Sequence, residues 1–266
     1  MATNDSSVKT ALITGASAGI GLEFVKVFAE NGFDVVLVAR REDKLNEIAQ
    51  EIKAQHGQLA HVIAADLADP DSPQAIYDAT KDRSLRIDAL VNNAGYAINE
   101  GFLETDWEIH QRFLQVLSTS LVQLCHLFGR DMRENGYGRI INLSSIAAFS
   151  PQLKGNLYGA AKSFVLDFSQ AIDLELREHN IYCTALCPGF TYSEFHQVMG
   201  VESMVGRLPK FLWMDANTVA REGYDAVMEG KPVYINGLVN QGVSQFMSHL
   251  PLSLKRIIAK QQSLFE

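Results

Sequence analysis

The sequence predicts an α/β fold in which helices cover both faces of a doubly wound parallel sheet. Short apolar runs alternate along the chain with segments whose apolar residues recur at helical spacing, and the first run ends in a glycine-rich turn. A chain of 266 residues is long enough to bury one large core without a second domain. We therefore expect residues 1–266 to form a single domain.

Charge and cysteine content limit the partners and compartments of this chain. A formal net charge of −8 leaves no basic face to attract nucleic acid, so no such partner is expected. Three scattered cysteines do not suit a disulfide framework or a metal site and fit a reducing, cytoplasmic setting. No run reaches the ~18 apolar residues of a transmembrane helix, and the polar opening MATNDSSVK is unlike a signal or transit peptide.

Six apolar runs are predicted to be strands of the sheet. They cover residues 8–14, 33–39, 59–66, 88–95, 139–144 and 181–190. The segments between them have helical spacing, and the longest, Trp107 to Arg133, is predicted as one helix. In such parallel sheets ligands bind beyond the carboxyl ends of the strands. The residues that follow each strand are therefore the candidates for a site.

The first strand ends in a turn with three glycines. Gly15, Gly19 and Gly21 form G-x-x-x-G-x-G, a looser relative of the dinucleotide fingerprint. Without side chains, the backbone N–H groups at the following helix N-terminus can approach a pyrophosphate. Ser17 and Ile20 of the same turn are predicted to bind the cofactor with them.

The second strand ends in Ala39, and Arg40 and Arg41 follow it. In dinucleotide folds an acid at this point accepts from a free ribose 2′-hydroxyl, whereas arginine accommodates a 2′-phosphate. The two arginines therefore favour NADP(H) over NAD(H). The alternative is that both only cap or flank the next helix.

Polar and small residues follow the third and fourth strands. Asp66, beside Leu67, can receive the adenine amino group, although an N-cap for a helix starting near Pro70 is equally simple. After the fourth strand, asparagine side chains are expected to hydrogen-bond across a neighbouring strand, while small residues leave room for a ring. The residues concerned are Asn92, Asn93, Ala94 and Gly95.

A serine, a tyrosine and a lysine are placed where one proton transfer can use all three. Tyr158 and Lys162 are four apart, so on a helix they share a face. A nearby ammonium favours phenolate and is expected to lower a tyrosine pKa from its usual ~10. Ser145 lies thirteen residues before Tyr158 and meets it only if it ends the neighbouring strand. The alternative is a plain helical turn with an exposed tyrosine and a solvated lysine.

With these motifs in order, the chain resembles the short-chain dehydrogenase/reductase family over nearly its whole length. The motifs are T-G-x-x-x-G-x-G, N-N-A-G, a serine thirteen before Y-x-x-x-K, and a P-G after the sixth strand. The resemblance implies a Rossmann-like fold, with Tyr158 as proton donor or base. Lys162 would hold the nicotinamide ribose hydroxyls, and Ser145 would bond the substrate oxygen.

The resemblance also assigns the segment after the sixth strand. Pro188, Gly189, Thr191 and Ser193 resemble the residues that fix the nicotinamide carboxamide. Ser193 stands where a threonine is common and keeps the hydroxyl.

One departure from the family concerns the long helix. Family members usually carry there an asparagine that interrupts the helical hydrogen bonding and holds a water linking the lysine to solvent. Leu117 occupies that place here. The proton relay is therefore expected to be missing or rerouted through Ser118 or Ser120, or through Gln115 if the alignment shifts by two.

Two further segments bear on substrate and partners. Residues 190–215 are rich in aromatics and methionines, which predicts a lid over a pocket for a small hydrophobic carbonyl or alcohol. The alternative is that the aromatics only pack the lid on the body. The tail 242–266 has helical spacing and is expected to pack on the protein, with a second subunit or a membrane surface as alternatives. By resemblance, a homodimer or homotetramer is expected.

Two functions remain in competition. The first is an NADP(H)-dependent oxidoreductase that interconverts an apolar ketone, aldehyde or oxoacyl group and its alcohol. The second is a nucleotide-binding regulatory or scaffold protein whose relay decayed at Leu117. The presence of Ser145, Tyr158 and Lys162 together favours the enzyme. An epimerase or dehydratase is disfavoured because the chain after Gly189 is short for a nucleotide-sugar domain.

Overall fold

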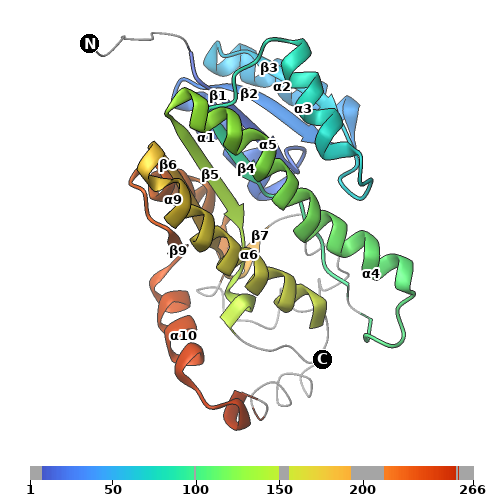
Figure 1. The fold of residues 1–266 in the computed structure, drawn as a ribbon, viewed down its shortest axis with the longest axis vertical. Helices are drawn as coiled ribbons and strands as arrows, with labels where there is room; N and C mark the ends of the chain where they lie inside the picture. Colours follow the sequence, from blue (N-terminus) through green and yellow to red (C-terminus); the bar gives the residue numbers. More distant parts are fainter. Residues whose placement is uncertain (1–7, 99, 150–155, 193–212, 256, 258–266) are drawn as a thin grey trace.

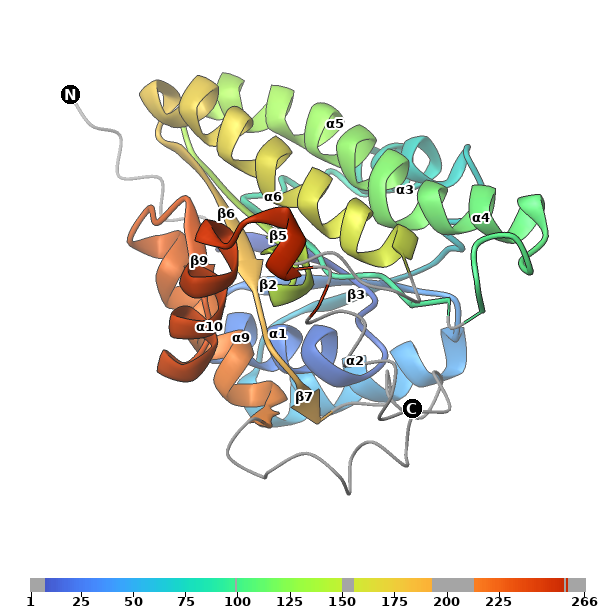
Figure 2. The ribbon, with the colours of Figure 1, turned by 90° about the horizontal axis from the view of Figure 1, so that it is seen from below.

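The computed structural model describes residues 8–98, 100–149, 156–192, 213–255 and 257, and it has three layers. A twisted parallel sheet lies in the middle, with helices on both faces (Figures 1 and 2). The predicted doubly wound fold is therefore confirmed.

The sheet has seven parallel strands in the order β3-β2-β1-β4-β5-β6-β9 among the described residues. The order reverses between β1 and β4, which are directly paired, so the crevice at their carboxyl ends is the expected ligand site. The strands are β1 (Thr10–Thr14), β2 (Asp34–Ala39), β3 (Ala60–Ala64), β4 (Ala89–Asn92), β5 (Gly138–Leu143), β6 (Ile181–Cys187) and β9 (Val233–Ile235).

Each face of the sheet has its own apolar core. One core includes Phe24 and Phe28, and the other includes Phe113 and Phe128. No helix in the described ranges is long and apolar enough to cross a membrane. The first core is covered by α1 (Gly19–Glu30), α2 (Glu42–His56) and α9 (Ala216–Met228), and the second by α3 (Ser72–Asp82), α4 (Trp107–Leu114), α5 (Ser120–Asn135) and α6 (Asn156–Leu176).

Two parts of the fold differ from the sequence prediction. The helix expected from Trp107 to Arg133 is interrupted, because α4 and α5 are joined by a π-helical turn, η1 (Gln115–Thr119). The strand β9 and the helix before it were not predicted. A strand of three residues is too short to give a readable alternation of apolar and polar positions.

The ends of the predicted lid lie side by side. β7 (Thr191–Tyr192) pairs in parallel with β8 (Met214–Asp215), so the described residues on either side of the lid are adjacent. Residues 193–212 lie outside the described part, so most of the lid, with Ser193, stays a prediction. Of the predicted tail, the described residues form the helix α10 (Leu238–His249) and a short turn after it.

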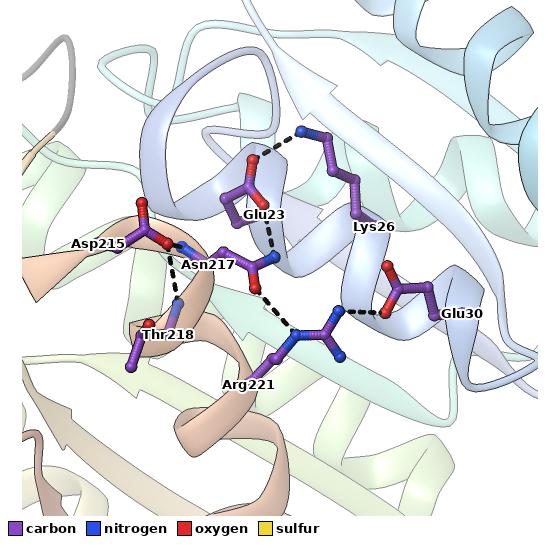
Figure 3. A network of polar contacts seen from close by, with 7 residues as sticks. All are labelled: Glu23, Lys26, Glu30, Asp215, Asn217, Thr218 and Arg221. Carbon is purple, nitrogen blue, oxygen red and sulfur yellow. Dashed lines mark hydrogen bonds and ion pairs between the residues drawn. The ribbon is translucent and has the colours of Figure 1, made fainter.

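A network of polar contacts ties α9, which follows the lid, to α1, which follows the glycine turn (Figure 3). Asn217 donates to Glu23 at 2.8 Å, and Arg221 pairs with Glu30 at 2.6 Å. Arg221 also donates to Asn217 at 2.9 Å, and this bond connects the two links. Asp215 caps α9 by accepting from the N–H groups of its first turn.

Replacing Arg221 by alanine should lower the free energy of unfolding by about 0.5–1 kcal/mol, because the pair is partly exposed but belongs to a network. Urea denaturation measures this. The control is Lys44→Ala, which removes an exposed pair within α2 alone and should lower the free energy of unfolding by less. Equal losses in both variants would show that the network adds nothing to the docking of α9.

Candidate active site

The glycine turn packs so tightly that side chains are excluded from it. Gly15 has a positive φ of 66°, and a Cβ there would lie 2.7 Å from the Asn93 amide nitrogen. A Cβ on Gly21 would lie 2.2 Å from the Gly15 carbonyl oxygen. No side chain among the described residues caps α1 at Ala18, so its first N–H groups stay available to an anion. This cradle fits a pyrophosphate.

Hydrogen bonds join the glycine turn to the end of β4. Asn93 donates through its side chain to the Thr14 carbonyl at 2.9 Å. The Thr14 hydroxyl accepts from the backbone N–H groups of Asn93 and Ala94 at 3.0 and 3.1 Å. These bonds fix the floor of the crevice, and Gly95 lies exposed beside it.

The expected bond across neighbouring strands is made by Asn92. Its amide nitrogen donates to Asn142 of β5 at 2.9 Å and to the Cys125 sulfur at 3.2 Å. Asn92 is buried in the sheet, so it supports the crevice from below.

Both arginines after β2 are exposed at the edge of the crevice, but they differ in their contacts. Arg41 is the N-cap residue of α2, yet its guanidinium donates to the Ser17 hydroxyl in the glycine turn at 3.0 Å. Arg40 lies close enough to Tyr96 to oppose the rise that burial causes in the Tyr96 pKa. Both cations therefore lie beside the crevice, and Arg41 does more than flank its helix.

Asp66 does not cap α3, because that helix begins at Ser72 with Asp71 as its N-cap. Instead, one Asp66 oxygen accepts from the Ala68 N–H at 3.0 Å. The other accepts from Arg112 of α4 at 3.1 Å. The proposed cap near Pro70 is therefore wrong. Arg112 is a member of the crevice edge that sequence reasoning missed, since nothing in the sequence pairs it with Asp66.

Tyr158 and Ser145 meet as predicted, the serine following β5 and the tyrosine lying in the first turns of α6. A side-chain hydrogen bond joins them, and the Ser145 oxygen also accepts from the Ala147 N–H at 3.1 Å. Burial raises the pKa of Tyr158 to about 12, and the bond with Ser145 opposes this only in part. The sequence had predicted a lowered pKa.

Burial is the cause of this difference, and the Lys162 ammonium, which was expected to lower the Tyr158 pKa, is bound elsewhere. This ammonium donates to the Leu143 carbonyl oxygen at 2.6 Å and lies 5.6 Å from the centroid of the Tyr158 ring. Lys162 is 6% exposed, and burial lowers its pKa to about 8. The expectation of a solvated lysine in a plain helical turn is therefore wrong.

Leu117 lies in the π-helical turn η1 and is 1% exposed. A Cβ on Gly95 would lie 3.8 Å from its side chain, so Leu117 forms part of the wall behind the crevice. Two of the residues expected to replace the missing proton relay, Gln115 and Ser120, are hydrogen-bonded elsewhere. Gln115 donates to the Ser120 hydroxyl at 3.0 Å, and this hydroxyl donates to the Leu67 carbonyl at 2.8 Å.

The segment after β6 lies over the site. The Pro188 carbonyl accepts from the Ile146 N–H at 3.1 Å, next to Ser145. Thr191 is buried, and its hydroxyl donates to the Gly189 carbonyl at 3.1 Å. A Cβ on Gly189 would lie 2.4 Å from the amide of Asn240 in α10, a second neighbour that the sequence did not reveal.

Taken together, the strand ends bring the predicted residues to one edge of the sheet, while Ser193 lies outside the described residues. No group of acidic, histidine or cysteine side chains in the described ranges is arranged to hold a metal. The remaining predicted member, Ile20, is half-buried at the start of α1 and packs on the core.

The family model for short chain dehydrogenases matches residues 9–202. The chain belongs to the short-chain dehydrogenase family. It is 32% identical to the serine 3-dehydrogenase of Agrobacterium fabrum over 249 residues, which is 89% of this chain and 96% of the relative. The family resemblance and the oxidoreductase class predicted from the motifs are thereby confirmed.

Solved structures of the family share this fold closely. A short-chain dehydrogenase from Sphingobium yanoikuyae in complex with NADPH matches with a TM-score of 0.80 and 30% identity, covering 92% of this chain and 97% of that one. The bulky-bulky ketone specific alcohol dehydrogenase from Comamonas testosteroni matches with a TM-score of 0.77 and 27% identity, covering 93% and 96%.

Proposed function

We propose that this short-chain dehydrogenase uses NADP(H) to interconvert an apolar ketone, aldehyde or oxoacyl group and its alcohol. One observation carries the proposal: Tyr158 is hydrogen-bonded to Ser145 at the end of β5, with the buried ammonium of Lys162 beside its ring. In reduction Tyr158 donates its proton to the carbonyl oxygen, and Ser145 holds that oxygen. In alcohol oxidation the phenolate accepts the proton.

The assignment of NADP(H) rests on the crevice from Gly15 to Arg41. The uncapped start of α1 suits the pyrophosphate, and the exposed arginines suit a 2′-phosphate. The NADPH complex of the relative from Sphingobium yanoikuyae supports the same choice. When bound, the cofactor supplies or accepts the hydride, Lys162 holds its ribose hydroxyls, and the Pro188–Gly189 segment orients its carboxamide.

The substrate side favours an apolar molecule. At the base of the lid, the Trp213 ring stacks on Tyr192 with 4.9 Å between centroids and lies 5.5 Å from that of Phe190. Leu117 adds an apolar wall behind Gly95. The names of the relatives refer both to serine, a hydroxy amino acid, and to bulky ketones. The choice of an apolar substrate therefore rests on the apolar side chains that line this part of the site.

We further propose a cytoplasmic homodimer or homotetramer. Cys125, Cys183 and Cys187 are all buried free thiols, which suits a reducing compartment. Phe164 and Leu174 are exposed on α6, one of the two helices through which the family resemblance implies pairing.

The test is turnover of NADPH with a panel of apolar ketones and aldehydes, followed by absorbance of the reduced cofactor. Serine and small polar ketones serve as the comparison set. Turnover of the apolar set is expected. Retained NADPH binding with no turnover of any compound would favour the regulatory or scaffold alternative, and turnover of the polar set alone would overturn the substrate class.

Replacing Arg40 or Arg41 by alanine should weaken NADPH binding at least about tenfold, since a hydrogen bond to a charged group contributes roughly 1.5–3 kcal/mol. NADH binding should change little because it lacks the 2′-phosphate. Fluorescence titration measures both. The control is Lys53→Ala, which removes a cation from the far end of α2. Equal losses for both cofactors would contradict the assignment.

NADPH affinity should fall as the pH rises above about 8. The lowered pKa of Lys162 leaves the amine charged below this value and neutral above it, and the charged form is the better donor to ribose hydroxyls. Stability changes in the opposite direction, because the cost of burying the ammonium is relieved as the pH rises from 8 towards 10.5.

Titrations and urea denaturation across pH 7–10 would measure the two trends. In the Lys162→Met variant, both the fall in NADPH affinity and the rise in stability with pH should disappear. A wild-type affinity that stays flat through this window would show that the charge of Lys162 does not contribute to cofactor binding.

A further inference from the structure

We propose that α10 and the turn after it bind the surface of an anionic lipid membrane. The inference does not depend on the proposed function, since it rests on the outer surface of the C-terminal helix. This helix stands at one edge of the molecule, beyond the last strand β9 (Figures 1 and 2).

The helix α10 buries a polar face and exposes an apolar one. The residues turned inward are Asn240, Ser244 and Met247, at a spacing of four and three. Within the described residues the Ser244 hydroxyl finds no hydrogen-bond partner, although the residue is buried. Asn240 donates to the Asn236 carbonyl at 2.8 Å, so the free-energy cost of this buried face comes from the unpaired Ser244 hydroxyl.

The outward face is apolar. Leu238 is 84% exposed and Phe246, two turns later on the same side, is 62% exposed. Val239 and Val243 flank them and are half-exposed. At 100° per residue these four side chains fall within about 140° of the helix circumference, with Gly242 and His249 among them and the glutamines Gln241 and Gln245 at the border.

The apolar surface continues beyond the helix. Leu252, Leu254 and Ile257 are each about half-exposed on the turn that follows Pro251. Exposed apolar side chains therefore recur along the chain from Leu238 to Ile257.

The charge of this part of the chain is opposite to that of the whole. The chain carries −8, yet no Asp or Glu occurs between Glu229 and Glu266. The cations in this interval are Lys231, Lys255, Arg256 and Lys260. Among the carboxylates that precede it, Glu222 accepts from Asn236 at 2.8 Å and Glu229 pairs with Lys231.

These observations favour a membrane over a second copy of the chain. Two copies meeting through this face would bring the same cations together, which is unfavourable. A lipid surface accepts the apolar side chains at the acyl boundary and the cations among anionic headgroups. Of the described cations, Lys255 lies beside the exposed Leu254 and Ile257, where it would meet anionic headgroups.

The inward face of α10, opposite the apolar one, lies near the catalytic crevice. α10 packs along the short turn η2 (Ile146–Phe149), which follows Ser145, and its Asn240 touches Gly189. A membrane bound by α10 would therefore lie beside the crevice, where an apolar substrate can be exchanged with the lipid.

The test is flotation of the full chain with two kinds of vesicle, phosphatidylcholine alone and phosphatidylcholine mixed with phosphatidylglycerol. Flotation with the anionic vesicles, reduced by added salt, is expected. Phe246→Glu should lower the partition coefficient at least about tenfold, because it removes a large apolar contact. Lys255→Glu should lower it by about fivefold for the anionic vesicles only.

The control is Leu59→Glu, which alters a half-exposed apolar residue beside β3, at the opposite edge of the sheet, and should leave flotation unchanged. Circular dichroism and gel filtration of each variant check folding and assembly. The proposal is overturned if the wild type does not float, or if Phe246→Glu floats as the wild type does. It is also overturned if Phe246→Glu dissociates an oligomer or lowers the melting temperature, since the face would then be covered by a second copy or by the chain itself.

Discussion

Replacing Tyr158 by phenylalanine should lower kcat/KM for ketone reduction by about 10²–10⁴-fold, the range typical of a lost general acid. The substitution removes only the hydroxyl, and the ring keeps its place beside the ammonium of Lys162. NADPH binding should therefore stay within about twofold of the wild type. Stopped assays with the best ketone and fluorescence titration with NADPH measure the two effects.

The pH profile gives this prediction a second readout. Alcohol oxidation needs the phenolate, and the raised pKa of Tyr158, about 12, keeps the phenol protonated over the ordinary range. At saturating cofactor, oxidation by the wild type should therefore rise steadily with pH, whereas reduction should stay level until the phenol ionises. Tyr158→Phe should lose the rise in oxidation.

The matched control is Tyr182→Phe. Tyr182 lies on β6 under the guanidinium groups of Arg139 and Arg177 and is far along the strand from its carboxyl end. Its hydroxyl has no part in the proposed chemistry, so turnover should be unchanged. A Tyr158→Phe enzyme that keeps half of the wild-type turnover would show that another group transfers the proton.

The sequence predicted those parts of the site whose signal is local. Gly15 and Gly21 are needed because the strand, turn and helix around them, and the neighbouring strand, leave no room for a side chain. Three glycines within seven residues of sequence indicate such a tight turn directly. Tyr158 and Lys162 share a face of one helix, so their spacing is sufficient to place them together. The strands could be predicted because each is a short apolar run between polar turns.

What the sequence could not show depends on contacts between distant segments. The pairing of Arg112 with Asp66 joins two exposed residues 46 positions apart, and neither belongs to a periodic pattern. The contact of Asn240 with Gly189 requires α10 to return over the end of β6. The rise in the Tyr158 pKa reflects burial and the turn of Lys162 towards Leu143, and neither can be inferred from a spacing of four.

Replacing Leu117 by asparagine should lower the free energy of unfolding by roughly 3–5 kcal/mol. Leu117 is almost fully buried in the core beneath α5, so the change leaves a cavity and places an amide in it. Urea denaturation measures the loss. Leu117→Ala, which leaves the cavity without the amide, should cost about 2–4 kcal/mol, and Leu117→Met less than about 1.5 kcal/mol.

Leu117→Asn should have a higher turnover per folded enzyme than Leu117→Ala, because its amide can restore a path for protons from Lys162 to solvent. Comparison with alanine rather than with the wild type separates the amide from the cavity. A turnover equal to that of Leu117→Ala would show that an amide at this position supplies no relay.

The shape of the helix should be independent of this substitution. The π-helical turn is present with leucine at its centre, so an asparagine side chain is not required to interrupt the helix. The chain of bonds from Gln115 through Ser120 to the Leu67 carbonyl offers a different cause, since it ties the turn to the segment after β3. Leu117→Asn therefore changes the relay while the backbone stays as it is, and Ser120→Ala would test what holds the turn itself.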